Sequence, residues 1–322
     1  MTKKSHFGIL SAVFYIHMIA SAWAQNWPTQ PIRIVVPWPV AGGPDIIARA
    51  FATGFQKAIT AQIIVENRPG ANSITGTRSV MSASPDGYTL LAANTAFGVN
   101  PSAYKKLPYD TLKDFSPISL IGKSTGYIVV VAPNSQLKSL TDLVSAAKNS
   151  KLFYGSAGIG NGTHLAAALF AHETGIEMGH IPYPGVADAM HAILTGEVNL
   201  AFVTTAAGLP KVKSGELKAI GYTGDKLPTG LNDAQLVNEI AENYQLSGAW
   251  VGLFAPTGTS SRIISEINRI ASVATKDDDF QSILRASGYE TEHGSPEDFG
   301  RFVATDIKSW EKAFQAARLN PQ

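Results

Sequence analysis

Pro31-Ile-Arg-Ile-Val-Val-Pro-Trp-Pro-Val-Ala-Gly-Gly-Pro-Asp-Ile-Ile-Ala-Arg49 is the stretch that decides the fold. Its β-branched run from Ile32 to Val36 predicts a buried strand, and the prolines and glycines of residues 37–44 allow no regular structure. From Asp45 the apolar residues recur at the spacing of a helix with one face toward a core. A strand, a glycine turn and a helix N-terminus together expose backbone N–H groups, which suit an anion.

The N-terminus has the pattern of a secretion signal. A short basic start (Lys3, Lys4) precedes a mostly apolar run, 7–20, and small residues surround a cleavage point after Ala24. The run is too short and too interrupted to span a bilayer comfortably. We therefore expect cleavage after Ala24 and a mature protein in the periplasm, the alternative being an uncleaved N-terminal anchor.

Composition narrows the class of protein. The 322 residues include no cysteine, which excludes disulfides and thiolate metal sites. Cleavage removes two of 26 basic residues and none of 25 acidic ones, so the mature net charge is −1 and nothing favours binding to nucleic acid or a membrane surface. A chain of this length suggests two lobes.

Strand and helix patterns alternate along the chain, which is typical of α/β layers with mostly parallel sheets. The expected strands are 32–36, 62–66, 89–92, 118–121, 128–132, 153–155, 181–183, 200–203, 217–221 and 251–255. The expected helices are 45–58, 73–83, 139–150, 163–174, 187–195, 260–275, 279–286 and 296–318.

A series of short motifs runs in order through the chain. They are PIRIVVP at 31–37 with GGPD at 42–45 and Arg49, VENRPG at 65–70, PDGYTL at 85–90, LPYD at 107–110 with KDF at 113–115, SAG at 156–158 with GTHLA at 162–166, IPY at 181–183 with Gly185, and GLFAPTG at 252–258. In this order they resemble the periplasmic solute-binding proteins of tripartite tricarboxylate transporters, also called the Bug (Bordetella uptake gene) family.

The resemblance implies an α/β, two-lobed type II periplasmic binding protein, or Venus flytrap, with a ligand cleft between its lobes. After the signal peptide, 1–24, it places lobe 1 at 25–123 plus 249–322 and lobe 2 at 124–248. It implies capture of a small organic carboxylate, either a di-/tricarboxylate or an aromatic carboxylate, for the membrane permease subunits of such a transporter. We expect a monomer, not an enzyme, with no cofactor and no metal.

The first expected ligand loop is 38–45. Gly42 and Gly43 permit close backbone approach and a positive φ, whereas Pro44 stands where relatives have threonine and supplies no N–H. Asp45 is expected to cap the following helix or to meet a cationic group of the ligand. Trp38 is expected to pack on the ligand or to cover the edge of the lobe, and Phe97 to form a second wall.

The second loop, 155–164, repeats this design on the other lobe. Ser156 and Thr163 bring hydroxyls, and the amides around Gly160 open a helix. His164 is expected either to contact the ligand or to pack against the sheet.

A third loop, 183–188, and the strand end at Thr204 complete the expected site. Relatives often place Lys or Arg where this chain has Pro184, and an acid where it has Thr204 and Thr205. These departures favour an acid without an amine. The full set of expected ligand-binding residues is Trp38, Val40, Ala41, Gly42, Gly43, Asp45, Asn94, Phe97, Ser156, Ala157, Gly158, Gly160, Thr163, His164, Tyr183, Gly185, Ala187, Asp188 and Thr204.

Three other functions compete with transport. A dinucleotide enzyme is disfavoured because the first loop lacks the G-x-G-x-x-G fingerprint. A secreted hydrolase would use Ser156, which lies outside any G-x-S-x-G elbow. A ligand-presenting sensor subunit for a receptor kinase would have the same sequence features as an uptake protein.

Overall fold

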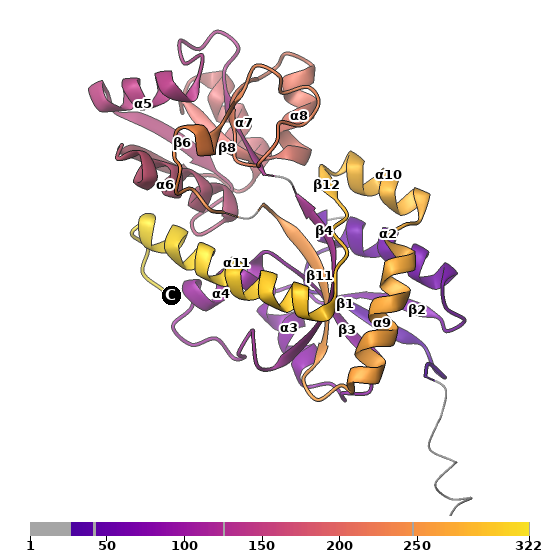
Figure 1. Ribbon diagram of the computed structural model, residues 1–322. Coiled ribbons are helices and arrows are strands. Elements are labelled where there is room, and N and C mark those ends of the chain that lie inside the picture. Colours follow the sequence, from indigo (N-terminus) through magenta and orange to yellow (C-terminus); the bar gives the residue numbers. More distant parts are fainter. Residues whose placement is uncertain (1–26, 41–42, 125, 247, 322) are drawn as a thin grey trace, which may run out of the picture.

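The computed structural model describes residues 27–40, 43–124, 126–246 and 248–321. Two six-stranded sheets with accompanying helices form two lobes (Figure 1). The expected two-lobed α/β class is therefore confirmed.

The first sheet has the strand order β12-β4-β11-β3-β1-β2. Its strands are β1 (Ile32–Val36), β2 (Ile63–Asn67), β3 (Thr89–Asn94), β4 (Phe115–Ser124), β11 (Trp250–Pro256) and β12 (Tyr289–Glu290). Its helices are α2 (Gly43–Lys57), α3 (Ile74–Met81), α4 (Ala96–Ala103), α9 (Ser261–Ala274), α10 (Asp278–Ala286) and α11 (Pro296–Ala316). The neighbours β3, β1 and β2 run parallel, and β11 is antiparallel to β3 and β4.

The second sheet has the order β10-β9-β5-β8-β6-β7. Its strands are β5 (Tyr127–Val131), β6 (Leu152–Ser156), β7 (Met178–Pro182), β8 (Leu200–Thr204), β9 (Lys218–Tyr222) and β10 (Gln235–Leu236). Its helices are α5 (Leu140–Asn149), α6 (Gly162–Thr174), α7 (Val186–Thr195), α8 (Thr205–Lys213) and the short 3₁₀ helix η2 (Val237–Glu239). The neighbours β8, β6 and β7 are parallel, so each sheet has three parallel strands at one end.

Helices α4 and α8 do not follow from the sequence pattern. Each contains a proline and a glycine, which are the weakest helix formers. A Cβ at Gly98 in α4 would collide with Asp306, and one at Gly208 in α8 would collide with Val203. Close tertiary packing, rather than helix propensity, therefore selects these two helices.

The chain passes between the lobes along two segments that lie side by side. The Ser124 amide donates to the Ala249 carbonyl over 2.6 Å. A Cβ at Gly248 would collide with the Ser124 carbonyl, so only glycine fits there. The strands of the second sheet all lie within the lobe expected at 124–248, and the exact lobe boundaries stay a prediction.

Helix α11 joins the cores of both lobes, although lobe 1 alone was expected to contain it. Phe299 and Val303, near its start, pack in the cluster that contains Phe254. Trp310 and Ala313, near its end, pack in a cluster of the second lobe. Figure 1 shows the helix running from beside β11 to beneath α6. Within the described ranges, no helix combines the length and apolar character that crossing a membrane requires.

The carboxylate of Asp306 fixes α11 where the two cores meet. It accepts the indole N–H of Trp250 over 2.8 Å and that of Trp310 over 2.9 Å. Asp306 is 2% exposed and both indoles are fully buried. A buried N–H that loses its acceptor costs about 1–3 kcal/mol.

We expect Asp306→Ala to lower the free energy of unfolding by about 2–5 kcal/mol, because two buried N–H groups lose their acceptor. Asp306→Asn, which keeps one oxygen, should cost less. Urea denaturation measures both. The matched control is Asp298→Ala in the exposed capping box of the same helix, for which about 1 kcal/mol is expected. Equal losses at Asp306 and Asp298 would contradict the anchoring role.

Candidate functional site

The topology brings most of the expected site residues to two sheet edges. The parallel strands β1, β2 and β3 all end at one edge of the first sheet, and β6, β7 and β8 end at one edge of the second. Because a helix follows each of these strands, the N-termini of α2, α3 and α4 begin near the first edge and those of α6, α7 and α8 near the second. Open α/β sheets bind their ligands at such edges.

The two edges face each other across a cavity of about 270 Å³. Asn72 and Tyr104 line it from the first lobe, and Ala157, Gly160 and Asn161 from the second. Part of the second ligand loop therefore faces the first lobe, whereas no described residue of the first ligand loop lines this cavity.

The first loop begins at a half-buried indole. Trp38 packs against the core of the first lobe, and its buried Nε1 finds no hydrogen-bond partner in the described part of the chain. Val40 is 68% exposed, and Ala41 and Gly42 lie outside the described residues. Gly43 opens α2 with no positive φ, and a Cβ there would meet nothing within 4 Å. Neither the backbone nor the surrounding protein atoms require glycine at 43.

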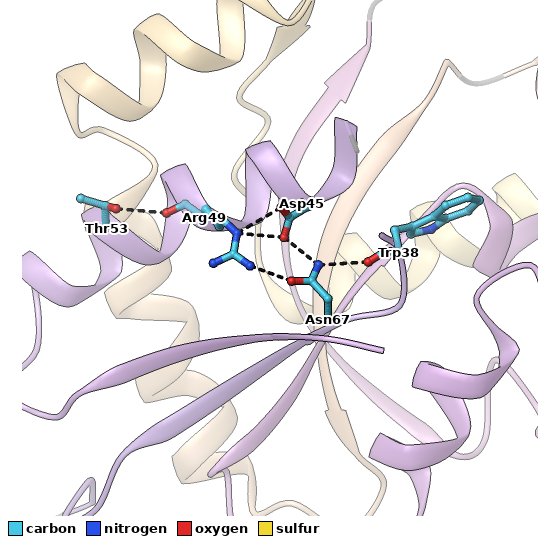
Figure 2. A network of polar contacts seen from close by, with 5 residues as sticks. All are labelled: Trp38, Asp45, Arg49, Thr53 and Asn67. Atoms are coloured by element: carbon cyan, nitrogen blue, oxygen red, sulfur yellow. Dashed lines mark hydrogen bonds and ion pairs between the residues drawn. The ribbon is translucent and has the colours of Figure 1, made fainter. Parts of the chain in front are cut away.

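The structure corrects one of the two expected roles of Asp45, that of helix cap. It is the third residue of α2, so it is not the N-cap. Its carboxylate is 1% exposed, accepts from Asn67 Nδ2 over 2.8 Å and pairs with Arg49 Nε at 3.0 Å. Figure 2 shows Asn67 between the Trp38 carbonyl and this ion pair. The carboxylate is therefore engaged within the lobe by Asn67 and Arg49, and its expected contact with a ligand stays a prediction.

The first edge also holds buried polar atoms that have no hydrogen-bond partner among the described residues. Besides Trp38 Nε1, these are Ser73 Oγ, at the start of α3, and Asn94 Oδ1, at the end of β3. The residues 71–73 have φ between 46° and 75°, a left-handed conformation that is strained for non-glycine residues. Unsatisfied buried groups and local strain both mark candidate ligand sites. Ser73 is not among the ligand-binding residues expected from the sequence, although it follows the motif at 65–70.

Phe97 is not a wall of the site. It is 1% exposed, and its ring packs against Tyr109, Phe115 and Phe254 at centroid distances of 4.8–5.9 Å. The unexpected helix α4 turns this side chain into the core of the first lobe.

The second loop holds itself together through its own hydroxyls. Ser156 Oγ donates to the Gly158 carbonyl over 3.1 Å and accepts the Gly158 amide over 3.2 Å. Thr163 Oγ1 accepts the Ala157 amide over 2.9 Å and donates to Asn161, the N-cap of α6. Ser156 and Thr163 are 1% and 2% exposed, so both hydroxyls organise the loop rather than point into the cavity.

His164 belongs to a stack of two imidazoles. Its ring lies parallel to that of His180, with 3.7 Å between centroids and 6° between planes. His164 Nδ1 accepts the Gly160 amide over 3.0 Å, and His180 Nε2 lies 2.7 Å from Ser156 Oγ. Burial lowers the pKa of His164 to about 3, helped by the proximity of His180, and lowers the pKa of His180 to about 4. Both rings are therefore neutral near pH 7, as the Gly160 contact requires.

These contacts change which amides of the second loop can hold an anion. The amides of Ala157, Gly158, Gly160 and Thr163 already donate within the loop. Those of residues 159, 162 and 164 have no acceptor among the described residues. The expected N–H cluster is therefore present at the start of α6, but on neighbouring residues.

The remaining expected residues lie at the starts of α7 and α8. Tyr183 and Gly185 lead into α7, whose first turn exposes Ala187 and Asp188. Thr204 is the N-cap residue of α8 and its hydroxyl makes no capping bond, which leaves it available to a ligand. The Thr205 hydroxyl is 3% exposed and donates to the Gly126 carbonyl, so it is not available.

The described parts of the ligand loops contain no Lys or Arg, and the nearby Arg49 is paired with Asp45. Helix N-termini and free amides are thus the positive groups of the site. No cluster of three or more potential metal ligands exists among the described residues.

Comparison with known proteins agrees with this geometry. The family model described as tripartite tricarboxylate transporter family receptor matches residues 47–319. A UPF0065 protein of Bordetella pertussis is 32% identical over 318 residues, 97% of each chain.

Two solved structures share the fold over most of their length. A TctC solute binding protein from Polaromonas, with no ligand, has a TM-score of 0.80 and 26% identity over 90% of this chain and 99% of that one. R. palustris Rpa4515 with adipate has a TM-score of 0.77 and 28% identity over 92% of this chain and all of the other.

The histidine pair predicts a dependence of stability on pH. Both folded pKa values lie below the 6.5 of a free imidazole, so the unfolded chain binds more protons between about pH 6.5 and pH 3. The stabilisation is complete above pH 6.5 and should be lost progressively as the pH falls through this window. Urea denaturation at about pH 7 and about pH 4.5 measures the loss.

Carboxylates also titrate at low pH, so variants are needed to assign the effect. A His164→Asn/His180→Gln protein should lose less stability between the two pH values than wild type. His172→Gln, at an exposed position of the helix α6 that also carries His164, should lose as much stability between the two pH values as the wild type. Equal losses in all three proteins would contradict the assignment.

Proposed function

Since the chain belongs to the tripartite tricarboxylate transporter receptor family, whose members are periplasmic solute-binding proteins, we propose that it captures an organic carboxylate without an amine for such a transporter. The observation that carries the proposal is the set of helix N-termini at the two facing edges. They supply partial positive charge and N–H donors from both lobes where no Lys or Arg is present in the described loops.

The adipate bound by Rpa4515 supports an aliphatic dicarboxylate as the ligand class. Thr204 supports the absence of an amine, because its hydroxyl cannot balance the charge of a ligand ammonium group. Asp45 cannot replace the missing acid, since Arg49 already neutralises it. A ligand that touches both lobes would stabilise the closed form through its higher affinity for that form.

A hydrolase is the second candidate, because Ser156 Oγ lies 2.7 Å from His180 Nε2. Ser156 is 1% exposed and its hydroxyl is bonded within the loop, and no carboxylate among the described residues orients His180. We propose that the pair is structural and that the protein returns its ligand unchanged. Turnover of a bound carboxylate or ester that disappears in Ser156→Ala would favour the hydrolase. A sensor subunit would show the same binding and would differ only in its membrane partner.

Adipate and succinate should raise the melting temperature of the mature protein, whereas glutamate and aspartate should not. At 100 times its Kd a ligand adds about 2.7 kcal/mol to stability. Calorimetry should give at least a tenfold preference for the acid without the amine, equal to about 1.4 kcal/mol. Tight binding of an amino acid with no binding of any dicarboxylate or aromatic acid would refute the proposed ligand class.

Gly43→Val should abolish carboxylate binding while the melting temperature without ligand moves by only a few degrees. A Cβ at position 43 meets no protein atom within 4 Å, so the added methyl groups should occupy the space in which the proposed ligand approaches the loop. Gly43→Ala, which adds only a Cβ, is the control and should retain measurable affinity. Normal affinity in the valine variant would mean that the ligand lies elsewhere.

A further inference from the structure

We propose that Asn67 and His180 are matched positioning residues, one in each lobe, that hold the two ligand loops in their binding shape. Asn67 lies on the edge strand β2 and contacts the loop that follows its neighbour β1. His180 lies on the edge strand β7 and contacts the loop that follows its neighbour β6. The proposal rests on the proposed function, because those loops form the carboxylate site.

In the first lobe, Asn67 ties the two ends of the loop that joins β1 to α2. Its Nδ2 donates to the Trp38 carbonyl over 3.0 Å and to Asp45 Oδ1 over 2.8 Å (Figure 2). Its Oδ1 accepts from Arg49 over 2.6 Å, which fixes the orientation of the amide. One side chain therefore determines how far apart Trp38 and the start of α2 lie.

In the second lobe, His180 does the same for the loop that joins β6 to α6. Its Nε2 contacts Ser156 Oγ at 2.7 Å, where the loop begins. Its ring stacks on His164, whose Nδ1 accepts the Gly160 amide in the middle of the loop. The ring pair thus holds the loop at two points.

The two residues lie on corresponding strands, although Asn67 pairs with Val36, the last residue of β1, whereas His180 pairs with Tyr154, two residues before the end of β6. In the first sheet, β2 is the edge strand beside β1 in the parallel set β3-β1-β2. In the second sheet, β7 is the edge strand beside β6 in the parallel set β8-β6-β7. Loops that are held before the ligand arrives lose less freedom when it binds, which raises affinity. Because the two contact networks share no residue, losses at the two sites should multiply in Kd.

The first test uses the mature protein without ligand. Asn67→Ala removes the amide, and His180→Phe keeps a ring for the stack but loses the bond to Ser156. Hydrogen exchange followed by mass spectrometry should show faster exchange at 36–46 in the first variant and at 155–164 in the second.

Each matched control removes a hydrogen bond between a side chain and the backbone in the same lobe as the variant. These bonds lie at the amino ends of β2 and β6, away from the ligand loops. Gln56 Oε1 accepts the Ile63 amide over 2.8 Å, and Asn199 Oδ1 accepts the Phe153 amide over 2.8 Å. Gln56→Ala and Asn199→Ala should leave exchange in both ligand loops unchanged. Unchanged exchange in Asn67→Ala and His180→Phe would overturn the proposal.

The second test measures adipate affinity by calorimetry. Each variant should bind about tenfold more weakly and the double variant about a hundredfold more weakly. His180→Gln, which retains a donor for Ser156, should bind more tightly than His180→Phe. Unchanged affinity in both single variants, or a double variant no weaker than the singles, would also overturn the proposal. If the wild-type protein binds no adipate, the proposal that its ligand is an aliphatic dicarboxylate such as adipate fails. The hydrogen-exchange data alone then decide whether Asn67 and His180 hold the loops.

Discussion

The carboxylate of Asp306, bonded to the indoles of Trp250 and Trp310, is the interaction on which the arrangement of the two lobes depends. Trp250 begins the strand that returns the chain to the first lobe, and Trp310 packs in the core of the second. One buried acid on α11 therefore links the returning strand to a helix that both cores share. The faces that carry the ligand loops are consequently joined by the crossing segments and by α11.

The sequence predicted the parallel units of this fold well. The β-branched run 32–36 and the helical spacing after Asp45 reappear as β1 and α2, and the strand at the start of the second loop reappears as β6. Such local patterns also place the loops, since parallel strands send their carboxyl ends to one edge. Helices α4 and α8 escaped prediction because their proline and glycine residues oppose helix formation until close packing compensates.

Individual side-chain roles were harder to predict, because they depend on partners far away in the chain. Asp45 was expected to cap α2 or to meet the ligand, but it is not the cap, and its carboxylate bonds Asn67 and Arg49. Phe97 looked like a wall until α4 turned it into the core. Ser156 and Thr163 do lie in the second loop, yet their hydroxyls bond the loop itself. Loop position follows from local sequence, whereas availability to a ligand follows from the whole network.

The absence of Lys and Arg from the described ligand loops has a consequence for how the protein works in changing surroundings. Attraction between full charges at a protein surface weakens as dissolved ions screen it, over about 8 Å at physiological ionic strength. In the proposed site, amides and helix ends contact the anion directly, and screening by dissolved ions is weak at that distance. For an anion bound as proposed, the affinity depends little on salt, so binding should be equally tight in dilute and in saline media.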